Sequence, residues 1–257
     1  MKIIVVANSK GGIGKSTTAC ALASILNKRG LKSLLIDADQ QANSSDTYHT
    51  KIEGEATLYD VLLEDHIPVS EAVQHTEAGD IVAADPLLRE ADAKLSSDPE
   101  GLYRMANALE GLKGYDYVVI DTAPAINWTL RNCLISADEV IIPVTADRYG
   151  VQGLSQLSET IAAIKKRSNN KLKIAGLLLV KYNPRTNLSK DVYETLEKIA
   201  KEMGTKLFET TIRDATKVKE AQTVRKNLID YAEKSNVALD YEKFVNELIG
   251  EKRHGKK

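Results

Sequence analysis

Apolar residues along this chain form short continuous runs, separated by stretches in which they recur three or four positions apart. The continuous runs predict strands that are buried on both faces, at residues 3–7, 33–37, 81–84, 117–121, 139–144 and 174–180. The periodic stretches predict helices at residues 16–29, 58–63, 98–112, 127–136, 153–166 and 189–203. Strands that alternate with helices indicate an α/β fold with a doubly wound, mostly parallel sheet flanked by helices.

A glycine-rich loop joins the first predicted strand to the first predicted helix. Residues 10–17 read Lys-Gly-Gly-Ile-Gly-Lys-Ser-Thr. Glycines let the chain curl and point backbone N–H groups at a polyphosphate, and the helix start adds positive dipole. Lys15 can meet the terminal phosphates, and the Ser16 hydroxyl suits Mg²⁺. A tight turn without a ligand is the structural alternative, but the strand, loop and helix in this order favour a bound nucleotide.

The loop resembles the deviant Walker A motif of the ParA/MinD family of partition and positioning ATPases, whose mark is an extra lysine at the loop start, here Lys10. The resemblance implies ATP and Mg²⁺ as cofactors and a homodimer that sandwiches ATP. It implies that Lys10 reaches the partner's nucleotide and acts in catalysis with Lys15. The nucleotide-binding residues that it implies in this loop are Lys10, Gly11, Gly12, Ile13, Gly14, Lys15, Ser16 and Thr17.

Two carboxylates follow the second predicted strand, in the segment Asp37-Ala38-Asp39-Gln40-Gln41-Ala42-Asn43. The carboxyl ends of parallel strands border the crevice in which ligands of such sheets bind, although a solvated turn is the alternative. The segment resembles the family's Asp-x-Asp-Pro-Gln-x-Asn, with Gln40 in place of proline. This likeness implies that Asp39 orients the attacking water and that Asp37 lies near the Mg²⁺ ion.

An apolar strand that ends at Asp121 has the Walker B arrangement, in which a carboxylate supports Mg²⁺ through its water shell. The sequence Asp121-Thr122-Ala123-Pro124 resembles the family's Asp-[Thr/Cys]-Pro-Pro, with Ala123 replacing the first proline. A cap for the helix at 127–136 is the alternative role of Asp121. The expected metal ligands are therefore Ser16, Asp37 and Asp121, partly through water.

The segment after the strand at 174–180 resembles the family's base-binding turn, which places Asn183 near the adenine. The run from Arg185 to Leu188 is more similar to ParA proteins than to MinD. Ser189 also suits the N-cap of the next helix. The stretch 149–154 resembles the family's segment at the dimer face, although Arg148 stands where an acidic residue is common.

Basic residues crowd the last third of the chain, at Arg213, Lys217, Lys219, Arg225 and Lys226. Lys and Arg make most of the phosphate contacts in sequence-independent DNA binding, whereas the interspersed acids also fit a solvated helix face. Together with the family resemblance, the pattern predicts non-specific DNA contacts by Arg185, Lys217, Lys219 and Arg225.

An apolar stripe at Tyr241, Phe244, Val245, Leu248 and Ile249 precedes a basic tail. Such a helix could lie on an anionic membrane, as the terminal helix of MinD-like proteins does, but docking on the core is the commoner arrangement. We therefore expect no membrane partner. Residues 251–257 are expected to form a flexible basic tail of a single ParA-like domain that spans residues 1–257.

Composition adds limits rather than a function. The 257 residues carry a formal net charge of -1, so any DNA contact must come from a local patch. Cys20 and Cys133 are far apart in sequence, which argues against a nucleotide-dependent metallochaperone or reductase subunit with a cysteine-held cluster. The expectation is an ATPase of the cytoplasm and, with ATP, the nucleoid, which acts with a ParB-like partner in partition. A MinD-like positioning ATPase is the alternative.

Overall fold

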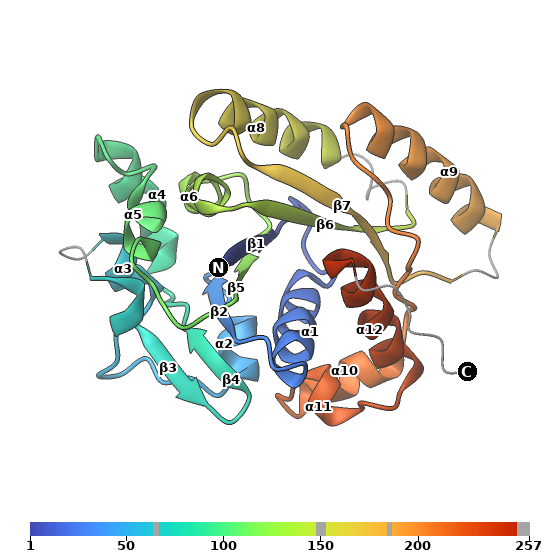
Figure 1. Cartoon of the computed structure of the whole chain (residues 1–257), viewed down its shortest axis with the longest axis horizontal. Helices are drawn as coiled ribbons and strands as arrows, with labels where there is room; N and C mark the ends of the chain where they lie inside the picture. The colour runs from blue at the N-terminus through green and yellow to red at the C-terminus, as the bar shows by residue number, and fades with distance from the viewer. Residues whose placement is uncertain (64–66, 148–152, 184–186, 251–257) are drawn as a thin grey trace.

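The computed structural model describes residues 1–63, 67–147, 153–183 and 187–250. Its centre is a seven-stranded sheet in the order β3-β4-β2-β5-β1-β6-β7 (Figure 1). The strands are β1 (Lys2–Val6), β2 (Ser33–Ala38), β3 (Val73–Thr76), β4 (Gly79–Val82), β5 (Tyr117–Thr122), β6 (Glu139–Thr145) and β7 (Lys173–Val180). Neighbouring strands pair in parallel except β3, which is antiparallel to β4. The expected mostly parallel α/β sheet is therefore confirmed.

Helices cover both faces of this sheet. They are α1 (Lys15–Lys28), α2 (Asn43–Thr47), α3 (Leu58–Leu63), α4 (Leu88–Ser97), α5 (Arg104–Leu109), α6 (Trp128–Ser136), α8 (Leu154–Arg167), α9 (Asn187–Glu202), α10 (Thr216–Thr223), α11 (Leu228–Tyr231) and α12 (Asn236–Ile249), with a short 3₁₀ turn at Val69–Glu71. Among the described residues, no helix combines the length and the apolar character that crossing a bilayer requires.

Each central strand is apolar on both sides because it separates two hydrophobic cores. In β1, Ile4 and Val6 face the core that contains α1 and α12, whereas Val5 faces the core that contains α6 and α8. All three side chains are fully buried. Figure 1 shows α1 and α12 side by side on one face of the sheet. The two-sided burial explains why the sequence of these strands is continuous rather than alternating.

The helix expected at residues 98–112 is shorter than its pattern suggests, because α5 begins only at Arg104. The Asp98 carboxylate accepts a bond from the Glu100 backbone and pairs with Arg104 at 2.7 Å. The chain here turns tightly over the end of α4: a Cβ on Gly101 would lie 2.0 Å from the Leu95 carbonyl oxygen. Residues 98–103 therefore form a turn and not a first helical turn.

The C-terminal helix α12 docks on the core, as expected. Tyr241, Phe244 and Val245 are at most 2 % exposed. The Phe244 ring meets Phe208 edge to face, with ring centroids 5.0 Å apart.

Helix α9 begins slightly earlier than the sequence predicted. Its first residue is Asn187, so Ser189 lies inside the first turn rather than at the expected N-cap position.

Candidate functional site

The glycine-rich loop leaves β1 at the carboxyl edge of the sheet and runs directly into α1. Gly12 and Gly14 have φ angles of 69° and 90°, in the left-handed region that side chains with a Cβ avoid. Gly14 is also the residue that precedes the first turn of α1. The Asn8 side chain connects the loop to β6: it accepts a hydrogen bond from the Lys10 backbone and donates one to the Pro143 carbonyl oxygen. The local geometry is that of an anion-binding loop at a helix N-terminus.

The two lysines of the loop have different surroundings. Lys15 is 6 % exposed, and its Nζ donates to the carbonyl oxygen of Lys10 at 3.0 Å. Burial lowers the pKa of Lys15, while the charges of Asp121 and Asp39 oppose that shift. Lys10 instead extends toward β6, where its Nζ lies 2.8 Å from both carboxylate oxygens of Asp147 and 3.3 Å from Thr145 Oγ1.

Two carboxylates lie beside each other under the loop. Asp37 and Asp121 are register partners at the ends of β2 and β5, and both are fully buried. Burial, together with the charge of Asp121, raises the pKa of Asp37 to about 7. Burial likewise raises the pKa of Asp121 to about 6, although the Ser16 and Ser44 hydroxyls favour its ionised form. The site therefore holds more carboxylate charge than the protein alone accommodates well.

Helix α2 supplies hydroxyl groups that the sequence analysis did not identify. Ser44 donates to Asp121 Oδ2 at 2.8 Å. Ser45 donates to Asp37 Oδ2 through its backbone N–H at 2.7 Å and through its hydroxyl at 2.8 Å. Two adjacent serines directly after Asn43 were the available signal. Their place against the two strand-end carboxylates is what only the structure reveals.

The residues expected around Mg²⁺ fit a hard cation. Asp121 Oδ1 is buried and has no hydrogen-bond partner among the described residues, so an acceptor oxygen is available next to Ser16. Carboxylate and hydroxyl oxygens are the ligands that Mg²⁺ prefers. The alternative role of Asp121 as a helix cap does not hold, because Asn127 caps α6 by accepting from Leu130.

A cavity of about 590 Å³ opens above these groups. Its walls are residues 11–17 of the loop, Asp39, Lys181, residues 212–215 and one side of α10 and α11. Asp39 is 5 % exposed and accepts a bond from the Gln41 backbone. Lys181 Nζ donates to the Gly12 carbonyl oxygen at 2.6 Å, a contact that the sequence did not suggest. Asn183, which was expected near the adenine, is exposed and is not among the residues that form these walls.

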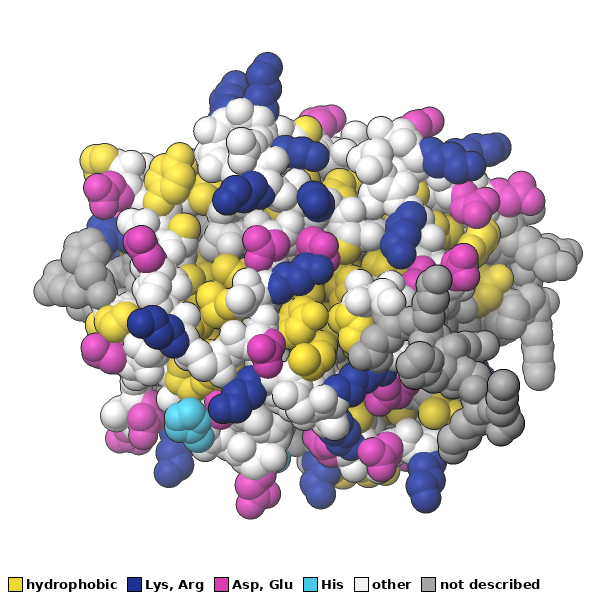
Figure 2. Space-filling view, viewed as in Figure 1, with side chains coloured by type: hydrophobic (Ala, Val, Ile, Leu, Met, Phe, Trp, Pro, Cys, Tyr) yellow, Lys and Arg dark blue, Asp and Glu magenta, His cyan; other side chains and the backbone are white. Residues whose placement is uncertain are grey.

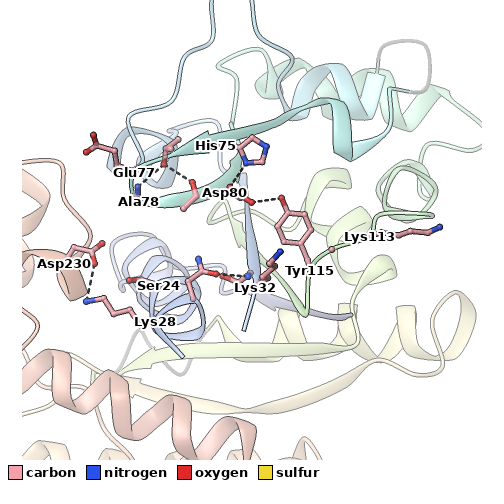
Figure 3. Close-up of a pocket in the computed structure, with 15 residues that line it drawn as sticks. Ser24, Lys28, Lys32, His75, Glu77, Ala78, Asp80, Lys113, Tyr115 and Asp230 are labelled. Carbon is pink, nitrogen blue, oxygen red and sulfur yellow. Dashed lines mark hydrogen bonds and ion pairs between the residues drawn. The ribbon is translucent and has the colours of Figure 1, made fainter. Parts of the chain in front are cut away.

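A second cavity, of about 660 Å³, lies at the opposite edge of the sheet, near the starts of β2 and β4. Figure 3 shows His75 and Tyr115 both bonded to Asp80, and Lys28 paired with Asp230. The described residues that line it include no part of the glycine-rich loop at residues 10–17. We therefore assign the phosphate chemistry to the cavity at the carboxyl edge.

The basic residues of the last third occupy different environments. Arg213 is held by the buried Asp240 in a two-pronged ion pair, at 2.6 and 2.9 Å. Lys217 pairs with Glu220 on the exposed face of α10, and Lys219 borders the cavity. Arg225 pairs with Asp46 of α2 at 3.2 Å. The expected DNA contact Arg185 and the departure at Arg148 lie outside the described residues.

The comparisons with known proteins agree with this geometry. The family model described as AAA domain matches residues 1–174. The chromosome partitioning protein ParA of Caulobacter vibrioides is 33% identical over 98% of this chain and 96% of its own length. The sporulation initiation inhibitor protein Soj of Bacillus subtilis is 34% identical over 93% of this chain and 95% of its own. This chain belongs to the ParA/MinD family of ATPases.

Among solved structures, this family member is similar to cobyrinic acid a,c-diamide synthase from Mycobacterium smegmatis, which was crystallised with an ATP analogue and magnesium. The TM-score is 0.83 and the identity 26%, over 100% of this chain and 98% of that one. A fold shared with a synthase does not fix the reaction, because one fold hosts several functions. The two curated relatives, at higher identity, bear partition and sporulation names.

Proposed function

We propose that this chain is a Mg²⁺-requiring ATPase that dimerises in ATP, binds DNA without sequence preference and acts in plasmid, chromosome or mobile-element partition with a ParB-like partner. The observation that carries the proposal is the presence of two lysines, Lys10 and Lys15, in one phosphate loop above the buried pair Asp37 and Asp121. The name of the chromosome partitioning protein ParA, a relative over nearly the whole chain, supports partition as the process.

In the proposed reaction, the loop backbone and Lys15 hold the phosphates of ATP. Asp39 orients the attacking water, and Lys10 of one subunit neutralises developing charge at the nucleotide of the other. Ser16, Asp121 and Asp37 would hold Mg²⁺, partly through water, and the ion would offset phosphate charge. Lys10 is bound to Asp147 within its own subunit, so it must leave that carboxylate before it can reach a partner.

Hydrolysis then ends the dimer, so that the nucleotide state controls DNA binding. Lys217, Lys219 and Arg225 are the described candidates for phosphate contact. A protein of this kind would reside in the cytoplasm and join the nucleoid in its ATP form. Its partner would act by raising the rate of hydrolysis.

The first test is co-sedimentation with random-sequence duplex DNA in ATP, in ADP and without nucleotide, across a salt series. Binding that occurs only in ATP and weakens steeply with salt is the expected result, because phosphate contacts release counterions. Anionic liposomes in parallel provide the comparison. DNA binding that ignores the nucleotide would contradict the proposal.

Substitution of Lys10 by Ala tests the dimer. The side chain is partly exposed, and its bonds within the described part of the chain are to Thr145 and Asp147 at the end of β6, so the fold should survive. We expect ATP-dependent dimers and partner-stimulated hydrolysis to disappear while the melting temperature stays within a few degrees of wild type. Size-exclusion chromatography with light scattering in ATP measures the first effect. Normal dimers in this variant would disprove the proposed role of Lys10.

A MinD-like positioning ATPase is the alternative, and the packing of α12 argues against it. The apolar stripe that would enter a membrane instead forms part of the core, where Tyr241 also bonds to Thr18 at 3.2 Å. Exposing that stripe would require α12 to leave α1. Liposome binding without DNA binding would nevertheless move the assignment to this alternative.

A further inference from the structure

Arg225 lies just beyond α10, at a backbone position that favours glycine. Its φ is 51°, and the following residue closes the helix end through a bond from the Lys226 N–H to the Ala221 carbonyl at 2.9 Å. Helices commonly place glycine at this position because a Cβ is strained there. An arginine at such a position points to a role for its side chain.

The Arg225 side chain connects α10 to α2. Its Nε lies 3.2 Å from Asp46 Oδ1, and the two side chains are 64% and 52% exposed. In the same short helix, Ser44 and Ser45 hold the carboxylates of Asp121 and Asp37. One end of this ion pair thus belongs to the surface proposed for DNA, and the other belongs to the helix that holds the buried carboxylates.

We propose that Asp46 and a DNA phosphate compete for Arg225, so that DNA binding releases α2 from α10. The inference rests on the proposed function and adds to it a route from DNA to the nucleotide site. A guanidinium makes charge-assisted bonds equally to carboxylate and to phosphate. An exposed ion pair contributes little to stability, so a phosphate can displace the carboxylate.

Two further bonds connect this region to α1 without passing through α2. Gln222 Nε2 donates to Thr17 Oγ1 at 3.3 Å, and Asn227 donates to the Cys20 carbonyl at 2.8 Å. Neither bond involves α2. Coupling between two sites is reciprocal, so loosening α2 should also favour DNA binding.

A double-mutant cycle of Arg225→Gly and Asp46→Asn tests the competition. Glycine suits the φ of 51°, so the Arg225→Gly protein should unfold at no lower temperature than wild type. The dissociation constant for a short random-sequence duplex is measured for all four proteins with a non-hydrolysable ATP analogue. We expect Asp46→Asn alone to tighten DNA binding about two- to fivefold, because it frees Arg225.

The same Asp46→Asn change in the Arg225→Gly protein should leave DNA affinity unchanged. A matched control is Glu233→Gln, which alters the net charge equally but removes a partner of Lys28. It should not affect DNA affinity. Equal tightening by Asp46→Asn in both backgrounds would mean that Asp46 simply repels DNA, and would overturn the inference.

Amide hydrogen exchange of residues 43–50 gives a readout that a purely structural role would not move. DNA should speed this exchange in wild type, whereas the Arg225→Gly protein should exchange quickly with or without DNA. If DNA binds to wild type but the exchange rate of residues 43–50 does not change, the inference is overturned and the proposed function is not. Absence of ATP-dependent DNA binding in wild type would overturn both the inference and the proposed function.

Discussion

At the scale of single residues, the site depends on the conflict between Asp37 and Asp121. The two are register partners on adjacent strands and both are fully buried, so their charges repel where water does not screen them. The pKa of each carboxyl group is raised by burial. A bound divalent cation would offset the repulsion between the two carboxylates. The pair therefore favours Mg²⁺ binding at the expense of the stability of the protein without the ion.

Asp37→Asn should therefore change how stability depends on pH. The pKa of Asp37 is about 7 in the folded chain, whereas the value in unfolded chains is about 4, so the native state binds the extra proton between these values. Its contribution to the free energy of unfolding is complete below about pH 4 and is lost as the pH rises to about 7. Asparagine has no titratable proton, so the variant keeps this contribution to the free energy of unfolding at every pH. We expect the variant to gain on the order of 2 kcal/mol relative to wild type between pH 5 and pH 8.

Urea unfolding of both proteins in buffer with EDTA measures this gain. Glu55→Gln is a matched control, because it removes the same charge at an exposed position. Its free energy of unfolding should stay within about 0.5 kcal/mol of wild type at each pH, because exposed substitutions away from specific contacts change stability little. A difference that stays constant with pH for Asp37→Asn would show that burial does not shift this carboxyl group.

The sequence identified most of the groups at the carboxyl edge but not their mutual contacts. Lys15, Asp39 and Asp121 follow strands or glycines that pattern alone reveals. Ser44 and Asp147 did not stand out, because serine and aspartate are ordinary in polar loops, and only folding brings them to Asp121 and Lys10. Roles that need ATP or a second subunit remain predictions.

At the scale of elements, α2 begins under strain. Ala42 precedes its first turn with a φ of 52°, and its N–H donates to the Asp39 carbonyl at 2.8 Å. A Cβ in this left-handed conformation costs about 1 kcal/mol. The strain is located between Asp39, the proposed water-orienting residue, and the serines of α2.

Ala42→Gly should stabilise the chain. Removing the Cβ relieves the strain, although the added freedom of the unfolded chain offsets part of the gain. We expect a net gain of about 0.5 kcal/mol in the free energy of unfolding. Ala93→Gly, at an exposed position inside α4, should instead cost about 0.5–1 kcal/mol. If both changes destabilise the chain, Ala42 is not strained.

Strands that form continuous apolar runs were predictable, and short or mostly polar elements were not. The inner strands β1, β2, β5 and β6 and the edge strand β7 are such runs, and they match the expected residues within a few positions. The edge strand β3 was missed because its four residues are mostly polar and pair only with β4. Helix α4 was missed because it buries only Leu88, Ala91 and Leu95 along its length.

At the scale of the whole molecule, charge gives little guidance to the binding surface. Figure 2 shows that acidic and basic side chains are interspersed on the face in view, without a large area of one sign. This distribution agrees with a net charge of -1. Any DNA affinity must therefore arise from a few residues, such as those around α10, rather than from a general positive field.

The cavity joins distant parts of the chain, so its ligand should stabilise the whole molecule. Its walls come from residues 11–20, 39–47 and 212–228, which include both α1 and α10. ATP with Mg²⁺ at a hundred times its dissociation constant should add about 2.7 kcal/mol to the free energy of unfolding, or about 5–10 °C in melting temperature. Thermal unfolding with ATP should show this rise with Mg²⁺ and a smaller one with EDTA, because the paired carboxylates then repel the phosphates. Lys15→Ala should abolish the rise, since the loop loses its only buried ammonium among the described residues. An equal rise in that variant would place the nucleotide elsewhere.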